Sequence, residues 1–375
     1  MRLHLAWRNM MHNKIRTLVL LSGIGFSILL LFMQMGLYNA CKLNSTMIYD
    51  MFRFDAILLA PQYVFIDDAG NLPLARAKTA LSVPGVESIA PLYLSTAQLR
   101  HPLSGETNAI LVMGVDIAAA PFKDPAKNQG LSVLKIKDAA LLDRKSALDY
   151  GPLPRGAWTE LNGHSIRILG DFYNGAGFIS GGSLIVSDDT FSQILGTAIR
   201  TPNAVLIRFS PGATAKTVLG RLQNQLKGDV QVLTRQELKA RERHFFMSVN
   251  PIGIMFTSGA VIAFLVGAVI LYQILSTEVT HHLREYATLK AMGYTGQDLK
   301  FVVISQGFLM TAAGFIPAAA LAALLYKVLR EGVLIPAHMT LGLLLFIFSA
   351  SLCMSGISGI LAVRRIQVAD PAELF

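Results

Sequence analysis

Four long stretches of the chain contain no charged side chain. They cover residues 17–41, 245–275, 301–326 and 339–363. A helix needs about 20 mostly apolar residues to cross the hydrocarbon core of a bilayer, and each stretch is at least that long. The sequence therefore predicts four membrane-spanning helices, with a short loop at 327–338 between the third and the fourth.

The overall composition agrees with a membrane protein. Hydrophobic residues make up 53% of the chain and charged residues only 15%, compared with about 25% charged residues in soluble domains. The net charge of +9 is not gathered into a basic cluster with interleaved aromatics, which argues against a nucleic-acid-binding surface. Cys41 and Cys353 lie in different apolar stretches, so we expect neither a disulfide nor a metal site between them.

Residues 1–16 are basic, and their apolar side chains share one face if the segment is helical. We predict a cytoplasmic amphipathic elbow with Trp7 at the level of the lipid headgroups. A cleaved signal peptide is the competing interpretation, and Ala40-Cys41 resembles a lipoprotein cleavage site. The apolar stretch at 17–41 is longer than the core of about 7–15 residues in such peptides. We therefore favour an uncleaved membrane helix.

Residues 42–244 are polar and rich in turn signals. We predict a mixed α+β domain inserted between the first and second membrane helices, with a possible second lobe at about 98–200. Its clearest part is a β-α-β unit with strands at 204–209 and 230–233 around a helix at 213–226. Other expected elements are strands at 54–60, 109–115, 165–169 and 184–187, and a helix at 75–83. A charged helix, Arg235–His244, follows the β-α-β unit and could run straight into the next span.

Small residues recur at four-residue spacing in the second and fourth apolar stretches. They are Gly259, Ala263, Gly267, Ser355 and Gly359. Small side chains let membrane helices approach closely, so these positions are candidates for helix packing or for a dimer interface. The alternative is the ordinary glycine and alanine content of membrane helices.

Basic residues beside the spans predict the orientation. Arg8 and Arg16 precede the first span, and Arg364 follows the last. The positive-inside rule then places both termini, including the tail 364–375, and the segment 276–300 in the cytoplasm. The inserted domain is expected on the outside, which is the periplasm if the membrane is a bacterial inner membrane.

No catalytic or metal-binding constellation stands out. The chain contains no G-x-x-x-x-G-K-[ST] motif, so it does not bind ATP through a Walker A loop. His281 and His282 are adjacent, and adjacent side chains in a helix point apart. The predicted spans contain no Asp, Glu, Lys or Arg, whereas proton- or ion-coupled transporters keep ionisable residues within the membrane. We predict a non-catalytic chain without a metal ion or a cofactor of its own.

Ser276–Lys300 is a charged island between two apolar stretches. Roughly helical spacing relates Leu283, Tyr286, Leu289, Lys290 and Met292 within it, and Gly293 stands where a helix would stop. We expect an amphipathic helix that lies outside the bilayer and docks on another protein.

The run E-Y-A-T-L-K-A-M-G-Y at 285–294 resembles FtsX-like permeases of the MacB type of ABC exporter, and most closely the DevC subfamily. Further matching segments lie along most of the chain. They are Leu5-Ala6-Trp7, Phe32–Gly36, Val232–Glu237, Pro251-Ile252-Gly253, Gln273-Ile274-Leu275 and Ala369–Ala372.

The resemblance implies a permease homodimer that works with a separate ABC ATPase subunit, which binds ATP and Mg²⁺. Movement driven by ATP would pass through the helices to the inserted domain, which would drive cargo through a periplasmic adaptor and a TolC-like outer-membrane channel. The charged island would then be the ATPase-coupling site. Its expected apolar contacts are Leu283, Tyr286, Leu289 and Met292, its rim charges are Arg284, Glu285 and Lys290, and Gly293 ends its helix.

Two related functions remain open at this point. A lipoprotein-releasing permease has the same architecture but takes its cargo from the inner membrane without an outer-membrane channel. A regulator like the cell-division FtsX protein moves no cargo and activates a cell-wall hydrolase. Nothing in the residues selects the cargo, for which a lipid or another amphiphile is the expectation.

Overall fold

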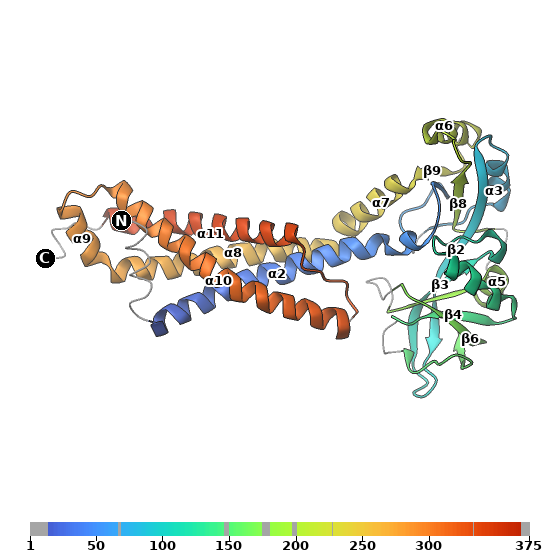
Figure 1. Ribbon diagram of the computed structural model, residues 1–375, viewed down its shortest axis with the longest axis horizontal. Helices are drawn as coiled ribbons and strands as arrows, with labels where there is room; N and C mark the ends of the chain where they lie inside the picture. Colours follow the sequence, from blue (N-terminus) through green and yellow to red (C-terminus); the bar gives the residue numbers. More distant parts are fainter. Residues whose placement is uncertain are drawn as a thin grey trace. The chain divides into compact units, whose positions relative to one another are not determined.

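The computed structural model describes residues 14–66, 69–145, 150–174, 181–196, 201–226, 228–332 and 334–368 (Figure 1). The chain divides into two compact units. The membrane unit contains residues 1–40, 251–330 and 337–375. The inserted domain contains residues 41–250 together with 331–336.

Four helices in the described part of the chain are long and apolar enough to cross a membrane, which confirms the predicted architecture of four spans with an inserted domain. They are α2 (Lys14–Met51), α8 (Pro251–His281), α10 (Gly296–Gly332) and α11 (Leu341–Val368). Helices α2 and α10 extend well beyond the apolar stretches that predicted them. Hydropathy marks only the part of a helix that suits lipid, whereas backbone hydrogen bonding continues through polar residues.

Small residues lie at the contacts between these helices. A methyl group added at Gly267 of α8 would stand 3.3 Å from Ser27 Cβ of α2, and one at Gly359 of α11 would stand 3.2 Å from Ile304 Cγ1 of α10. Ser358 donates a hydrogen bond of 2.7 Å to the Ala268 carbonyl, which joins α11 to α8. Gly267 and Gly359 therefore lie at contacts between helices of one chain. A role of the predicted positions in a dimer stays a prediction.

The first half of the inserted domain is a four-stranded antiparallel sheet in the order β9-β1-β8-β2, with the arrangement of a ferredoxin-like βαββαβ unit. Its elements are β1 (Ala56–Leu59), α3 (Leu74–Leu81), β2 (Val86–Arg100), β8 (Ala204–Phe209), α6 (Ala215–Gln225) and β9 (Gln231–Thr234). Side chains alternate between the two faces of the strands. Ala56 and Leu58 pack in a cluster with residues of α3 and α6, while Ile57 and Leu59 belong to a second cluster that includes the end of α2.

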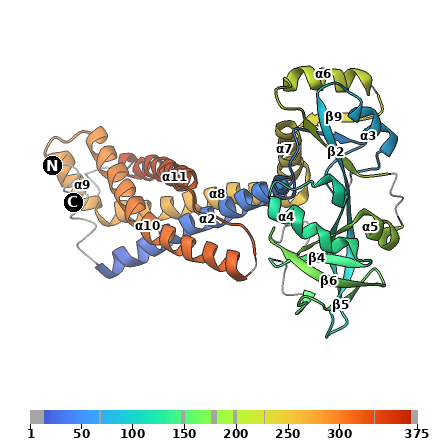
Figure 2. The same ribbon diagram turned by 45° about the vertical axis from the view of Figure 1, so that its right-hand side comes forward.

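The second half of the domain is a closed barrel, because β2 is long enough to leave the first sheet and pair with β3 and β5. The circle β2-β3-β7-β4-β6-β5 contains both parallel and antiparallel pairs, and Leu99 of β2 faces Leu161 of β5. Closure removes the free edges that an open sheet exposes. Figure 2 shows this half at the opposite end of the domain from α6. The elements are β3 (Thr107–Val115), α4 (Pro125–Gly130), β4 (Ala139–Asp143), β5 (Trp158–Leu161), β6 (His164–Phe172), β7 (Ser183–Ser187) and α5 (Asp188–Leu195), with 3₁₀ turns at Ile117–Ala119 and Leu131–Lys135.

Candidate functional site

Helix α7 (Arg235–His244) begins at a well-defined cap. Thr234 Oγ1 accepts a hydrogen bond of 3.1 Å from the Glu237 main-chain N–H, and Glu237 Oε2 accepts one of 2.8 Å from the Thr234 main-chain N–H. This reciprocal capping box satisfies two of the donors that every helix N-terminus leaves free. It fixes Arg235 as the first residue of the helix.

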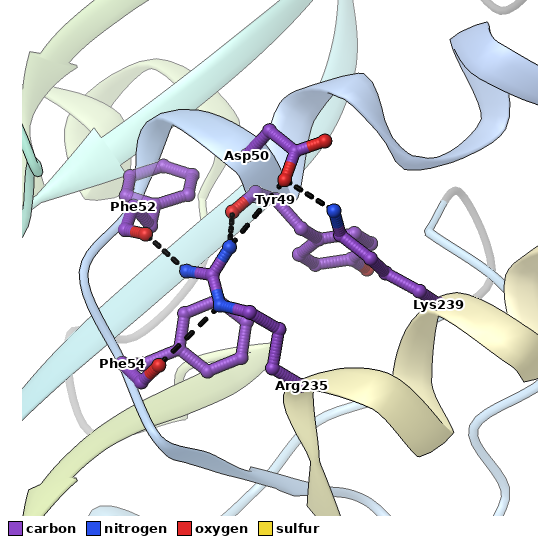
Figure 3. A network of polar contacts seen from close by, with 6 residues as sticks. All are labelled: Tyr49, Asp50, Phe52, Phe54, Arg235 and Lys239. Carbon is purple, nitrogen blue, oxygen red and sulfur yellow. Dashed lines mark hydrogen bonds and ion pairs between the residues drawn. The ribbon is translucent and has the colours of Figure 1, made fainter.

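Arg235 binds the carbonyl groups at the end of α2, as Figure 3 shows. Its guanidinium donates to the main-chain oxygens of Tyr49 (3.2 Å), Phe54 (3.4 Å) and Phe52, and it stacks 4.1 Å from the centre of the Phe54 ring. The last carbonyls of a helix have no partner within the helix, so a planar cation with several donors is well suited to them. We call Tyr49, Asp50, Phe52, Phe54, Arg235 and Lys239 the Arg235 clamp.

Asp50 supplies the negative charge of the clamp, opposite the cations Arg235 and Lys239. Its carboxylate lies 3.5 Å from Arg235 Nη1 and also pairs with Lys239, one turn further along α7. Burial lowers the pKa of the Arg235 guanidinium, and the neighbouring carboxylates of Asp50 and Asp55 oppose that effect. The clamp therefore joins two segments that lie about 185 residues apart in the chain.

A second contact between the same helices is buried. Tyr63 donates a hydrogen bond to the carboxylate of Glu242, and the hydroxyls of Tyr49 and Tyr63 lie 2.7 Å apart. Burial raises the pKa of Tyr63 well above its usual value, with smaller contributions from Tyr49 and Glu242. Because the only hydroxyl proton of Tyr63 goes to Glu242, Tyr49 must donate to Tyr63. The end of α2 and the last turn of α7 are thus tied through the loop that carries Tyr63.

Helix α7 does not run straight into α8, contrary to the sequence expectation. It passes into a π-helical turn, Phe245–Val249, and Asn250 then takes an extended conformation with ψ of 133°. Pro251 explains the break, because the ring of a proline disfavours helical geometry in the residue before it.

The charged island forms the helix α9 (Leu283–Ala291) between α8 and α10. Gly293 follows with φ of +95°, a left-handed conformation that ends the helix. Helix α10 then begins directly after Thr295, whose hydroxyl donates a 2.7 Å hydrogen bond to the Asp298 carboxylate. These observations place a short helix where the sequence predicts one.

The prediction that Tyr286 is a surface contact for a partner is wrong. Its side chain is only 2% exposed and packs in a cluster with valines of the neighbouring helices. Those valines are Val279, Val302, Val303 and Val363. Helical spacing correctly groups Tyr286 with the apolar face of α9, but that face is turned inward and fastens α9 to the membrane unit.

Polar residues that the sequence did not indicate surround Tyr286. Glu278 is buried near the end of α8 and accepts a hydrogen bond of 3.4 Å from Gln306 of α10. His282 lies between two carboxylates, with Nε2 3.7 Å from Glu278 and Nδ1 3.1 Å from Glu285. Sequence reasoning missed Glu278 because it follows directly after an apolar stretch and belongs to the charged island, which the sequence predicts to lie outside the bilayer.

The outward side of this region consists of Arg284, Glu285, Thr288, Met292 and Tyr294, which we call the outer face of α9. Met292 is 64% exposed, and Tyr294 is also exposed. Leu283 is half-buried. The side chains of Leu289 and Lys290, together with residues 1–13 and 369–375, lie outside the part that the structure describes.

Residues 257–370, which include α9, α10, α11 and most of α8, match the model of the FtsX-like permease C-terminal family. This part of the chain is similar to the C-terminal part of FtsX-like permeases. The match confirms the family resemblance that the E-Y-A-T-L-K-A-M-G-Y run indicates, while the DevC subfamily stays a prediction. No curated protein matches the sequence of this chain.

Solved structures resemble the inserted domain of this chain. The periplasmic region of MacB from Actinobacillus actinomycetemcomitans is 12% identical, with 52% of this chain and 94% of that chain covered and a TM-score of 0.38. The extracellular domain of the noncanonic ABC-type transporter YknZ from Gram-positive bacteria is 14% identical, with coverage of 48% and 100% and a TM-score of 0.36. A domain of a putative permease protein from Porphyromonas gingivalis is 15% identical, with coverage of 48% and 90% and a TM-score of 0.32.

Proposed function

We propose that this chain is the permease subunit of a MacB-type ABC exporter and acts as a mechanical relay. The observation that carries the proposal is the FtsX-like match of residues 257–370. In this proposal a separate ATPase binds ATP and Mg²⁺ in the cytoplasm and moves the membrane helices. The inserted domain lies on the opposite side of the membrane and delivers the movement to its partners, with both termini in the cytoplasm.

The Arg235 clamp suits such a relay. It binds the end of α2 to the start of α7, and these two helices belong to the segments through which the inserted domain is joined to the first and second spans. A charged, multiply hydrogen-bonded contact resists relative movement of the two helix ends. A displacement of either helix is then passed to both, and to the sheet that they border.

The outer face of α9 supplies the surface for the ATPase. Arg284 and Glu285 provide charges of both signs beside the exposed Met292 and Tyr294. Partly apolar patches with a charged rim are typical of protein interfaces. Tyr286 contributes indirectly, because it holds α9 against the other helices.

The ATPase contact is tested by affinity purification of the tagged full-length chain from its own host, followed by mass spectrometry and an ATPase assay. We expect an ABC ATPase to co-purify, and Met292→Asp to lower its yield strongly, because a charge buried at an interface without a partner costs several kcal/mol. Leu103→Asp in the inserted domain is the control, since Leu103 is also an exposed apolar residue. Equal recovery of the ATPase with Met292→Asp and with the unchanged chain would exclude this face as the docking site.

We further propose that the inserted domain binds a periplasmic adaptor that leads to an outer-membrane channel, with two permeases in each complex. Cysteines placed between residues 98 and 195 should crosslink to that adaptor in whole cells. Crosslinks to a lipoprotein carrier would instead favour a lipoprotein-releasing permease, and crosslinks to a cell-wall hydrolase would favour a regulator.

A further inference from the structure

The loop Tyr63–Ile66 of the inserted domain is fastened along α7 and the π-helical turn that follows it. Arg241 donates to the Tyr63 carbonyl, and Glu242 accepts from the Tyr63 hydroxyl. Phe65 stacks on Phe245 with ring centres 4.4 Å apart and planes inclined by 13°. The loop therefore runs beside the chain from Arg241 at the end of α7 to Phe245 in the π-helical turn.

This arrangement leaves apolar side chains uncovered. Val64 is 40% exposed in the loop, and Val249 is 54% exposed in the π-helical turn. Phe246 is buried beneath the turn and meets the Phe65 ring edge-on at 6.0 Å. Exposed apolar surface next to fixed aromatic rings is a common mark of an interaction site.

Two basic residues lie between Glu242 and Phe245 in the chain. Arg243 is half-buried, its Nε makes no hydrogen bond to any described group, and His244 is exposed. The terminal nitrogens of a guanidinium bind phosphate oxygens well. The patch thus combines apolar and aromatic side chains with a cationic donor.

Chain connectivity identifies the surface that this patch can reach. Val249 stands two residues before Pro251, the first residue of the membrane-spanning helix α8. Even a fully extended chain covers at most about 3.6 Å per residue, so Phe245 stays within roughly 22 Å of Pro251. Aromatic and basic side chains next to a span favour the headgroup layer of the bilayer.

We propose that Val64, Phe65, Arg243, Phe245 and Val249 form a lipid-contacting patch, which binds the phosphate and upper acyl region of the bilayer that α8 crosses. The inserted domain then has an attachment to the membrane surface in addition to its covalent links to the spans. This proposal depends on α8 crossing a membrane and is independent of an ATPase, an adaptor or a cargo.

The test uses the full-length chain with Cys41→Ala and Cys353→Ala, which removes both native cysteines. A single cysteine is placed at Val64, Val249 or Leu81 and labelled with an environment-sensitive fluorophore. Leu81 on α3 is the matched control, because it is 46% exposed and lies in the same domain. The purified chain alone is reconstituted into liposomes of phosphatidylethanolamine and phosphatidylglycerol, with or without lipids that carry a nitroxide near the top of the acyl chain.

We expect the nitroxide lipids to cause a large loss of fluorescence at positions 64 and 249 and little loss at position 81. Iodide in the aqueous phase should give the reverse order. The proposal is overturned if position 64 behaves like position 81 with both quenchers, which would leave the patch free for a protein partner. It is also overturned if shielding at position 64 disappears on dilution of the chain in lipid, because a second copy would then be the occupant. Position 249 provides the same comparison if labelling at position 64 prevents reconstitution.

Discussion

Arg235 donates a hydrogen bond to the main-chain oxygen of Phe52, the residue that follows the last residue of α2. The side chain that opens α7 therefore caps another helix of the same domain. Because the capping box of Thr234 and Glu237 fixes the start of α7, the guanidinium is held in place before it meets its acceptors. The end of α2 is therefore capped by a side chain whose own position is already fixed.

The first prediction concerns loss of that side chain. Arg235→Ala removes hydrogen bonds to three carbonyl groups, and bonds that involve a charged group contribute about 1.5–3 kcal/mol each. We expect faster amide hydrogen exchange in residues 46–54 and 235–244 of the full-length chain, with a loss of local stability of roughly 4 kcal/mol or more, because three such bonds are lost.

Arg235→Lys should recover only a small part of this loss. The lysine keeps a charge near Asp50, but a single ammonium cannot reach three carbonyls in a planar arrangement. Arg53→Ala is the control, because Arg53 lies in the same segment and is exposed. Equal exchange in the Arg235→Ala and Arg53→Ala variants would show that the clamp does not stabilise this junction.

The second prediction concerns Tyr286. Burial, and then the charges of Glu278 and Glu285, raise the pKa of its phenol, so the group stays neutral at physiological pH. No described group forms a hydrogen bond with its hydroxyl. Tyr286→Phe should therefore leave the melting temperature of the detergent-solubilised chain unchanged or slightly raised, since a buried unsatisfied hydroxyl costs stability.

Tyr286→Asp should lower the same melting temperature strongly, because it buries a charge among valines. This substitution therefore cannot separate ATPase docking from folding, which Met292→Asp is designed to do. A drop of the melting temperature in Tyr286→Phe as large as in Tyr286→Asp would mean that the hydroxyl has a partner essential to the fold.

Much of the fold follows from the sequence because its signals are local. The four apolar stretches, the β-α-β unit at 204–233 and the helix Arg235–His244 each carry their own periodicity. The sequence prediction lacks β2, β4 and β5. Pro91 interrupts β2, and a proline lowers the expectation of a strand. Without these three strands the closed barrel cannot be assembled.

The candidate site was harder to predict from the sequence, for a different reason. Periodicity shows which residues of α9 share a face, but only tertiary packing decides that the face with Tyr286 is turned inward. The contacts of Arg235 with Phe52 and of Glu242 with Tyr63 join residues about 180 positions apart. No pattern within a short segment indicates such pairs.

The third prediction concerns pH. Burial, the largest cause, raises the pKa of Asp188 at the start of α5, and Asp116 adds to the effect. A carboxyl group with a raised pKa in the folded state stabilises that state most when it is protonated. Its contribution is therefore greatest below about pH 4 and is lost as the pH rises through the unfolded and then the folded pKa.

Asp188→Asn should consequently make the inserted domain more stable than the unchanged chain at neutral pH, and the difference should shrink toward pH 4. Fluorescence of Trp158 during thermal unfolding reports on this domain. Asp124→Asn is the control, because Asp124 is an exposed carboxyl group of the same domain. A gain in stability for Asp188→Asn that is the same at both pH values would contradict the assigned cause.

The last prediction concerns Gly36 of α2. Tyr326 of α10 lies directly over it and donates a hydrogen bond to the Phe32 carbonyl, one turn earlier in α2. A methyl group added at Gly36 would stand 2.6 Å from Tyr326 Cε1, far inside normal contact distance, so the two helices would have to separate. Overpacking of this kind costs about 1–3 kcal/mol, and Gly36→Ala should lower the melting temperature of the chain accordingly.

Gly342→Ala in α11 is the matched control, because nothing lies within 4 Å of the added group there and alanine favours a helix over glycine. The double variant Gly36→Ala with Tyr326→Leu should be less destabilised than the sum of its single variants, because the shorter side chain removes the clash. Strict additivity in that comparison would show that Gly36 and Tyr326 do not pack against each other.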